Sequence, residues 1–339
     1  MNRISIAKEL LNSGEPSIRW KMRTRVFGEA LESKAILELQ EEIRKSPRVL
    51  ALLGRRSRGG RLERGNNVYQ KWQGAHWTLA ALADIGYPAG DAKLIPIREQ
   101  ILDFWLGERF YREFEAKTKA DVYTQEGVPV MRGRHRRCAS QQGNALYCLL
   151  KLGLADKRTE RLAERLIHWQ WPDGGWNCDK TPGADTSSFM ETLLPMLGLG
   201  LLGRMRNNKQ AAKAARKASE VFLSRDFFKR RSNGKIIHPE FLSLHYPLYW
   251  HYDILGGLKA MAELGLIKDP RCSAALDLLE SRELADGGWA AEKRYYKVSK
   301  KVELGAEFVD WGGTGKKKMN PWVTADALYV LNAAGRFPG

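Results

Sequence analysis

The segment LHYPLYWHYDILGG, residues 244–257, concentrates imidazole, carboxylate and aromatic side chains. His251 and Asp253 lie close together in it, and an imidazole beside a carboxylate suits general acid–base catalysis near neutral pH. Aromatic rings around a cavity can stabilise a cation or stack on a sugar ring. We therefore predict catalytic roles for His251, Tyr252 and Asp253, and substrate contacts for His245, Tyr249 and Trp250. Packing in the core is the alternative interpretation.

A second group of polar residues lies in NVYQKWQGAHW, residues 67–77, at or just before the start of an apolar helix. Lys71 offers a cation for an anionic group of a ligand, and His76 can donate or accept a proton. We predict His76 as a catalytic residue, with Tyr69 and Lys71 as substrate contacts.

The segment RGRHRRCASQQGNALYC, residues 132–148, places a basic loop directly before another apolar helix. The first N–H groups of a helix lack intrahelical acceptors, and the helix dipole favours anions there. Arg136, Arg137 and Gln141 are therefore predicted to contact a phosphate or carboxylate group. A solvated loop is the alternative.

Two further catalytic candidates, Asp185 and Glu191, lie in NCDKTPGADTSSFMET, residues 177–192. Asp185 could instead cap the following helix by accepting a backbone hydrogen bond. Glu191 lies on an apolar helix and needs a polar partner if it is buried. Nearer the C-terminal end, Asp310 and Trp311 are predicted to contact the substrate, because FVDWGGTGKKKMNPW (residues 308–322) could close over a ligand.

The cysteines argue against a disulfide framework and against a metal site. They are widely spaced and include no CxxC pair, which is typical of reduced thiols in a cytoplasmic protein: Cys138, Cys148, Cys178 and Cys272. Cys178 could join His135, His168 or His251 at a metal ion, but no ligand spacing supports this. We therefore predict neither a metal nor a cofactor.

Helical periodicity dominates the elements that must position these residues. Residues 143–176 predict an apolar helix, a glycine-containing turn, an amphipathic helix and the ending Pro-Asp-Gly-Gly-Trp, and residues 252–289 repeat this plan. Weaker copies cover residues 74–106 and 185–223, and residues 320–337 predict a final helix. Because the first helix of each pair is apolar and the second amphipathic, we expect inner and outer helices.

The ordered residues Arg165, Gln170, Gly175 and Trp176 resemble the QW repeat of squalene–hopene and oxidosqualene cyclases. The helix pairs also resemble those of protein prenyltransferase β-subunits, and the resemblance covers roughly residues 66–337. It implies an all-α fold of the α/α-toroid type, with about five or six helical hairpins around a central cavity. It also implies that Gln170, Gly175 and Trp176, like Gly288 and Trp289, form a structural clasp between neighbouring hairpins.

The catalytic motifs of those families are not present in full. The acidic DxDD motif of squalene cyclases and the DDxxD motif that binds metal in diphosphate-ionising synthases are both missing. In the segment that matches the zinc ligands of prenyltransferases, Asp185 is present but Ser187 occupies the cysteine position. The chain therefore resembles a divergent member of the superfamily.

Composition limits the organisation and location of the protein. The 339 residues, of which 43% are hydrophobic, can bury a sizeable core. We predict an N-terminal helical extension over residues 1–65, packed on a toroid domain over residues 66–339. There is no long apolar run for a membrane span and no visible secretory signal, so we expect a cytoplasmic protein.

Three functions are compatible with these observations. The leading hypothesis is an enzyme that acts by acid–base chemistry on a prenyl-type or other anionic or hydrophobic substrate in a central cavity. The formal charge of +17 also suits a lyase or hydrolase of acidic polysaccharides on the same fold. The third hypothesis is a non-catalytic helical-repeat protein that binds nucleic acid or another protein, although nucleic acid is not the favoured partner.

Overall fold

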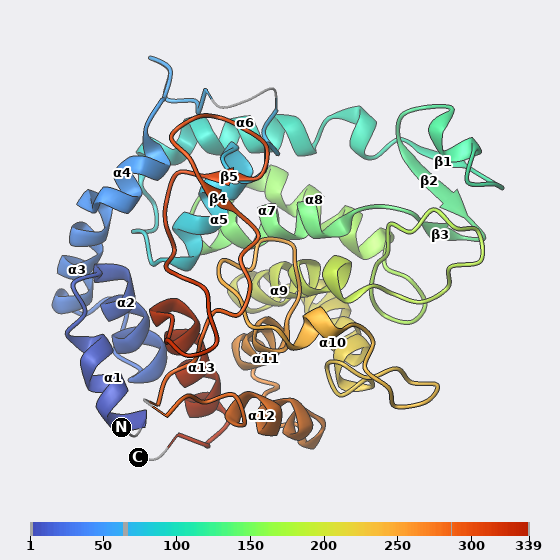
Figure 1. Ribbon diagram of the computed structural model, residues 1–339. Coiled ribbons are helices and arrows are strands. Elements are labelled where there is room, and N and C mark those ends of the chain that lie inside the picture. Colours follow the sequence, from blue (N-terminus) through green and yellow to red (C-terminus); the bar gives the residue numbers. More distant parts are fainter. Residues whose placement is uncertain (1–2, 64–66, 286, 338–339) are drawn as a thin grey trace. The chain divides into compact units, whose positions relative to one another are not determined.

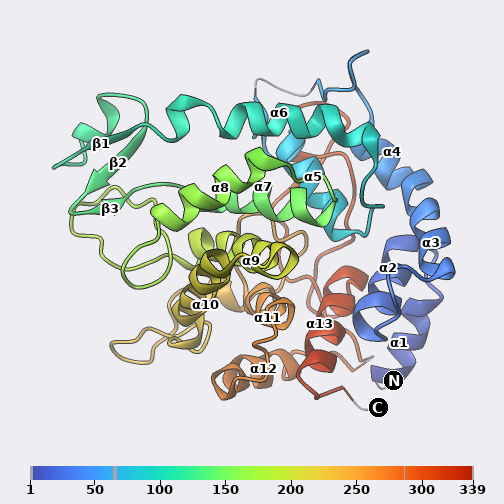
Figure 2. The same ribbon diagram turned by 180° about the vertical axis from the view of Figure 1, so that it is seen from behind.

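A computed structural model describes residues 3–63, 67–285 and 287–337 (Figures 1 and 2). The chain is predominantly helical, as the sequence predicted, but it also contains two small sheets that the periodicity did not indicate. Within the described residues, no helix combines the length and the apolar character needed to cross a bilayer.

The chain forms two compact units. The first comprises Met1–Gly90 and Arg225–Gly339, and the second comprises Asp91–Ser224. The N-terminal helices therefore belong to the same unit as the C-terminal third of the chain, and the division expected at residue 65 falls inside that unit.

Packed helix pairs dominate the second unit. Its elements are α6 (Ile95–Trp105), β1 (Glu113–Glu115), β2 (Val128–Met131), β3 (Arg134–His135), α7 (Ala139–Lys151), α8 (Lys157–His168), α9 (Phe189–Arg206) and α10 (Lys209–Leu223). Helices α7 and α9 lie side by side (Figures 1 and 2). Gly143 permits this approach, since a Cβ atom there would lie 2.3 Å from the backbone nitrogen of Pro195.

Helix α8 presents one face to the core and the other to solvent. Leu162 and Leu166 are fully buried, whereas the charged residues Arg161 and Glu164 are exposed. Its start is fixed by a capping box in which the Asp156 side chain accepts from the first turn and Thr159 reaches back to the Asp156 backbone. The last residue of the helix, His168, contacts Glu113 of strand β1.

The sheet of the second unit joins a parallel and an antiparallel pair. Strand β1 runs parallel to β2, and β2 pairs antiparallel with β3, with Val130 opposite His135. This arrangement brings Glu113 of β1 and His135 of β3 close to His168 at the end of α8.

In the first unit, α13 is the central element. The elements of the first unit are α1 (Arg3–Leu11), α2 (Pro16–Lys21), a π-helical turn (Met22–Val26), α3 (Lys34–Lys45), α4 (Pro47–Leu53), α5 (Ala75–Asp84), α11 (Ile254–Glu263), α12 (Ser273–Glu280), the parallel strands β4 (Lys297–Val298) and β5 (Ala306–Glu307), and α13 (Pro321–Ala333). Helix α13 contacts α1, α2 and α11 (Figure 1). Its side chains are buried almost throughout, which explains its apolar sequence.

Each unit contains one copy of the Gly-Gly-Trp ending, and the two copies make the same hydrogen bonds. The indole Nε1 atom donates to a carbonyl ten residues upstream: Trp176 to Leu166 at 2.9 Å, and Trp289 to Leu279 at 2.8 Å. The backbone N–H of each tryptophan donates to a threonine hydroxyl of the next helix, Thr192 at 3.2 Å and Thr324 at 2.9 Å. The repeat therefore ties the end of one helix to the start of another within each unit.

Gln170 adds a further contact at the first copy. Its Nε2 atom donates to the carbonyls of Gly174 at 2.6 Å and Ala214 at 2.9 Å, which connects the end of α8 to α10. At Gly175 a Cβ atom would lie 2.3 Å from Thr192 Oγ1, so the close approach of this turn to α9 requires glycine.

Candidate functional site

A pocket of about 650 Å³ opens in the second unit. Its wall contains four basic side chains and one acidic side chain, together with apolar residues and two thiols: Arg109, Arg136, Arg137, Lys180, Glu126, Phe110, Tyr123, Cys138 and Cys178. This composition favours a ligand that carries negative charge and also has an apolar part.

The cations of the pocket rest on aromatic faces. The guanidinium carbons of Arg109 and Arg137 both lie 4.7 Å from the centre of the Phe110 ring. Lys180 Nζ lies 4.2 Å from the Tyr123 ring centre. A ring holds a cation in place but does not neutralise it, so these charges stay available to an anion.

Arg136 is the most deeply placed of these cations. It is 2% exposed, its guanidinium lies 4.6 Å from the Trp171 ring centre, and its Nη2 atom makes a 3.5 Å contact with the Pro182 carbonyl. Its Nε and Nη1 atoms have no hydrogen-bond partner among the residues that the structure describes. Burial, with Arg134 adding repulsion, lowers the pKa of Arg136. A buried guanidinium with free donors is a site for an anionic acceptor.

Glu191 occupies the helix N-terminus that the sequence assigned to an anionic ligand. Its Oε2 atom accepts from the Ser140 backbone N–H at 3.0 Å, in the first turn of α7. The expected anion contact at these backbone groups is therefore made by the chain itself. Gln141, predicted as a ligand contact, accepts from Arg137 Nη2 at 3.4 Å and so orients that side chain.

The second oxygen of Glu191 faces the thiols of the pocket. Cys178 Sγ donates to Glu191 Oε1 at 3.3 Å, and Cys138 adjoins both residues. The Cys138 thiol, burial and the Glu191 carboxylate together raise the pKa of the Cys178 thiol well above its ordinary value. Burial also raises the pKa of Glu191. These three side chains form one cluster, and its two cysteines lie in the pocket wall beside Arg136 and Arg137.

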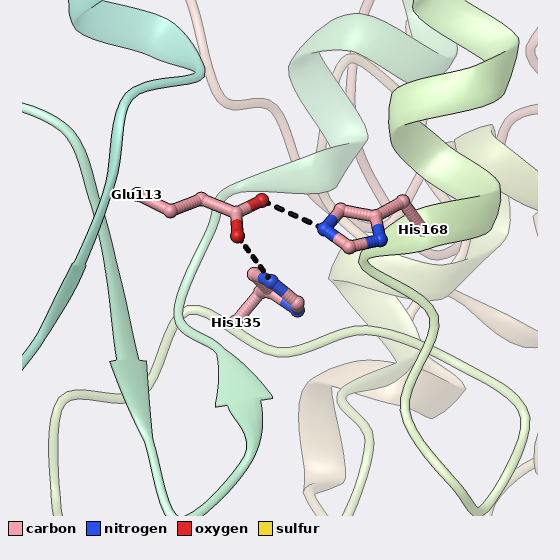
Figure 3. Close-up of side chains that lie close together, drawn as sticks. All are labelled: Glu113, His135 and His168. Atoms are coloured by element: carbon pink, nitrogen blue, oxygen red, sulfur yellow. Dashed lines mark ion pairs between the residues drawn. The ribbon is translucent and has the colours of Figure 1, made fainter.

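A second cluster with ligand-type side chains surrounds Glu113 (Figure 3). Its carboxylate points between two imidazoles, with Oε2 3.1 Å from His135 Nε2 and Oε1 2.9 Å from His168 Nε2. Trp169 Nε1 also donates to Oε1 at 3.2 Å. Burial alone would raise the pKa of Glu113, but the bond with His135 and the other partners outweigh it and lower the pKa. The His168 side chain is 61% exposed, so this cluster lies at the surface.

In the first unit, Asp253 pairs with His245. The distance from Asp253 Oδ2 to His245 Nδ1 is 2.9 Å, and both side chains are 1% exposed. His245 Nε2 has no hydrogen-bond partner in the described part of the chain. Burial alone would lower the pKa of His245, but the Asp253 carboxylate outweighs it and raises the pKa above 6.5. A carboxylate that orients an imidazole in this way is the arrangement of a general base.

His251 belongs to a stack of rings beside this pair. Its ring lies 3.6 Å from the Tyr295 ring at an interplanar angle of 13°, and 4.1 Å from the Trp250 ring at 22°. Burial, with His245 and Lys71 nearby, lowers the pKa of His251 to about 3. His251 is thus a neutral stacking partner at neutral pH.

Residues from the two aromatic segments of the first unit come together. Lys71 Nζ lies 4.8 Å from the Trp250 ring centre, and Tyr249 stacks on Trp72 at 4.0 Å. Tyr69 and His76 adjoin the same group, with their ring centres 5.3 Å apart. Burial lowers the pKa of His76 to about 3. The predicted residues of segments 67–77 and 244–257 thus form one cluster, although their separation in the sequence gave no sign of it.

Other predicted site residues have structural surroundings. Tyr252 is 2% exposed and donates to the Phe227 carbonyl at 2.8 Å. Trp311 is 0% exposed and packs on Trp322, so it does not face a ligand. Asp310 accepts from the backbone N–H of Gly312 at 3.0 Å.

Asp185 does not cap the helix that follows it. Helix α9 starts at Phe189 with Ser188 at the N-cap position, and Asp185 is exposed in the loop, where it accepts from the Thr186 hydroxyl at 2.9 Å. Residues 186–188 separate Asp185 from the first residue of α9, so Asp185 does not occupy the N-cap position.

Sequence reasoning missed a buried charge network in the first unit. Lys21 is 1% exposed and lies 2.6 Å from Asp84 and 2.9 Å from Asp326. Lys259 pairs with the same two carboxylates at 2.8 and 2.7 Å, and Tyr246 donates to Asp84 at 2.7 Å. The four charged residues come from α2, α5, α11 and α13, so no local pattern reveals the network.

Comparison with known proteins adds no relative to this description: no protein-family model matches the chain, and no curated protein sequence matches it.

Proposed function

We propose that the protein is an enzyme that binds an anionic, partly apolar substrate in the pocket of the second unit. Prenyl-type phosphates and diphosphates combine these two properties. The observation that carries the proposal is Arg136, a guanidinium that is 2% exposed and has unpartnered Nε and Nη1 atoms within the described residues. Phe110 and Tyr123 supply apolar surface in the same pocket for the rest of the substrate.

The fold that we propose for this enzyme is the α/α toroid. Two observations support it: helix pairs recur along the chain, and the Gly-Gly-Trp endings at Trp176 and Trp289 make matching hydrogen bonds. In the cyclases and prenyltransferases that this chain resembles, such helix pairs surround a cavity for a prenyl chain. The substrate class in our proposal rests on the chemistry of the pocket together with this resemblance.

Ligand binding tests the proposal directly. Titration calorimetry should show that the protein binds inorganic diphosphate. A short prenyl diphosphate should bind with higher affinity, and the matching prenyl alcohol should bind only weakly. Arg136→Gln should weaken diphosphate binding by about 10- to 150-fold, the range expected for hydrogen bonds to a charged group. Arg206→Gln is the matched control, because it removes one charge from an exposed helix end of the same unit.

Equal binding by Arg136→Gln and Arg206→Gln would contradict the proposal, since net charge alone would then account for the affinity. Binding of nucleic acid that surpasses diphosphate binding, with a steep dependence on salt, would instead support the non-catalytic binder.

A second candidate function is acid–base catalysis in the first unit, as in lyases or hydrolases of acidic polysaccharides. The pair of His245 and Asp253 favours it, because His245 Nε2 is oriented and has no partner among the described residues. The Trp250 ring and the Lys71 ammonium nearby could hold a sugar and its carboxylate. Loss of uronate-polymer cleavage in His245→Gln, with folding retained, is the expected result.

A further inference from the structure

We propose that Cys138, Cys178 and Glu191 bind one zinc ion, with its fourth coordination position facing the pocket. The three residues come from separate places: the residue before α7, the loop after the Trp176 turn, and the first turn of α9. Their ligand atoms all lie within 4.8 Å of one another. The use of this ion in catalysis rests on the proposed function, whereas its binding does not.

The distances suit zinc. A tetrahedral ion with Zn–S bonds of about 2.3 Å and a Zn–O bond of about 2.1 Å places sulfur and oxygen roughly 3.6 Å apart. Cys178 Sγ and Glu191 Oε1 are 3.3 Å apart, with the thiol hydrogen between them. Replacement of that proton by a metal ion needs only a small movement of either side chain. Two thiolates also favour zinc over magnesium, calcium or manganese.

The carboxylate is held ready for this role. Glu191 Oε2 accepts from the Ser140 backbone N–H at 3.0 Å, which leaves Oε1 directed at Cys178. An outer partner that fixes the orientation of a ligand is a regular feature of metal sites. The helix N-terminus also stabilises the ionised carboxylate that a metal requires.

The charges of the surroundings balance a bound zinc ion. Two thiolates and one carboxylate carry −3, so the group with Zn²⁺ carries −1. Arg137 stands close enough to interact electrostatically with all three side chains and would offset that charge.

An open coordination position connects the ion to the pocket. Cys138 and Cys178 both line the pocket wall beside Arg136 and Arg137. A zinc ion with three protein ligands activates a bound water or polarises a phosphoryl or carbonyl oxygen. The two arginines would hold the anionic group of the substrate near that position.

The cluster of Glu113, His135 and His168 is the less suitable candidate. The Trp169 indole donates to Glu113 Oε1, the same oxygen that faces His168, whereas the outer partner of Glu191 bonds the oxygen that does not face Cys178. The contacts of Glu113 with the two histidines are drawn in Figure 3. The exposed His168 side chain also gives little protection from solvent. This cluster therefore serves as the internal control.

The test is a titration of the reduced, metal-free full-length protein with Co²⁺, followed by competition with Zn²⁺. We expect one Co²⁺ per chain, thiolate-to-cobalt charge-transfer absorption, and displacement of the cobalt by one equivalent of zinc. Cys138→Ser and Cys178→Ser should each reduce that absorption and weaken binding by more than about a hundredfold, beyond the roughly 10–100-fold cost of losing an outer partner. Glu191→Gln keeps an acceptor for Ser140 and should weaken binding with the absorption retained.

Matched controls distinguish this site from the remaining thiols and from the histidine cluster. The variant Cys272→Ser removes a buried thiol of the other unit. The single variants His135→Gln and His168→Gln each disrupt the second cluster. All three variants should bind cobalt like the unchanged protein. The proposal is overturned if the protein takes up no cobalt, if Cys178→Ser binds it equally well, or if the histidine variants lose it. Circular dichroism confirms that each variant is folded.

The zinc site and the anion pocket can fail separately. If Arg136→Gln loses diphosphate binding while no variant binds metal, the proposed function stands and the zinc site is wrong. If cobalt binds as expected but Arg136→Gln binds diphosphate normally, the zinc site stands and the proposed substrate is wrong.

Discussion

The Asp253 carboxylate pairs with His245, whose Nδ1 atom lies 2.9 Å from Oδ2, while His251 stacks on Tyr295. Backbone groups hold the carboxylate on both sides: Oδ2 accepts from the His245 N–H at 2.9 Å, and Oδ1 caps α11 by accepting from Gly256 at 2.7 Å. The acid–base pair expected at His251 is therefore formed by His245, and the cap of α11 sets its geometry.

The His245–Asp253 pair should make stability depend on pH above neutrality. The pKa of His245 is higher in the folded chain than the ordinary 6.5, so its contribution is fully present below pH 6.5. It is lost as the pH rises through the raised folded value. Urea denaturation of the wild type and His245→Gln from pH 5 to 9 should show their difference in unfolding free energy shrinking as the pH rises.

Asp253→Asn is the companion variant, because asparagine is also a good N-cap and retains an acceptor for α11. It should remove the same pH dependence without melting the helix. If the difference in unfolding free energy between the wild type and each variant stays constant from pH 5 to 9, the His245–Asp253 pair makes no charge interaction that stabilises the fold.

Two other histidines should reduce stability in acid. His76 and His251 each have a pKa of about 3 in the folded chain and about 6.5 when exposed. The unfolded chain therefore binds more protons between these values, and stability falls as the pH drops from 6.5 toward 3. His76→Gln and His251→Gln should each lower the proton uptake on unfolding at pH 5 by about one, measured from the slope of unfolding free energy against pH. An unchanged slope would show that the imidazole is already protonated.

The Trp176 turn should contribute strongly to the stability of the second unit. Trp176→Ala removes a ring that is 1% exposed and should cost about 3–5 kcal/mol. Trp176→Phe retains much of the apolar surface but loses the bond to the Leu166 carbonyl, and should cost about 1 kcal/mol beyond the change in ring size. Thermal unfolding followed by circular dichroism provides the measurement. An unchanged melting profile in Trp176→Ala would rule out a structural role for this turn.

Removal of one carboxylate from the buried charge network should destabilise the first unit. Asp326→Asn leaves Lys21 and Lys259 to share Asp84, and loss of one partner from a buried pair costs about 3–5 kcal/mol. The double variant Lys259→Met/Asp326→Asn restores the balance of charge, so its cost should be smaller than the sum of the two single changes. The measurement is chemical denaturation of the wild type, Lys259→Met, Asp326→Asn and the double variant, which together form a double-mutant cycle. Strict additivity would show that the charges do not interact.

Periodic apolar residues allowed the helical elements to be predicted from the sequence. The pairs at 143–176 and 252–289 correspond to α7–α8 and α11–α12, because the spacing of apolar residues and the Gly-Gly-Trp ending are both local signals. The strands β1 to β5 contain at most four residues each and carry no clear period.

Contacts between distant segments could not be predicted in the same way. Glu191 meets Ser140 across 51 positions and Lys21 meets Asp326 across 305, and no pattern in one sequence encodes such distances. The same holds for Cys138 with Cys178. The residue types of the pocket were visible in the sequence, but their grouping depends on tertiary packing.

The interrupted course of the first unit has a consequence for synthesis of the chain. All residues of Asp91–Ser224 have been made before the ribosome reaches Arg225, whereas the partners of Met1–Gly90 are still missing at that stage. Lys21 in particular must wait for Asp326. The inserted unit can thus fold during translation, and the unit that begins first in the sequence is completed last.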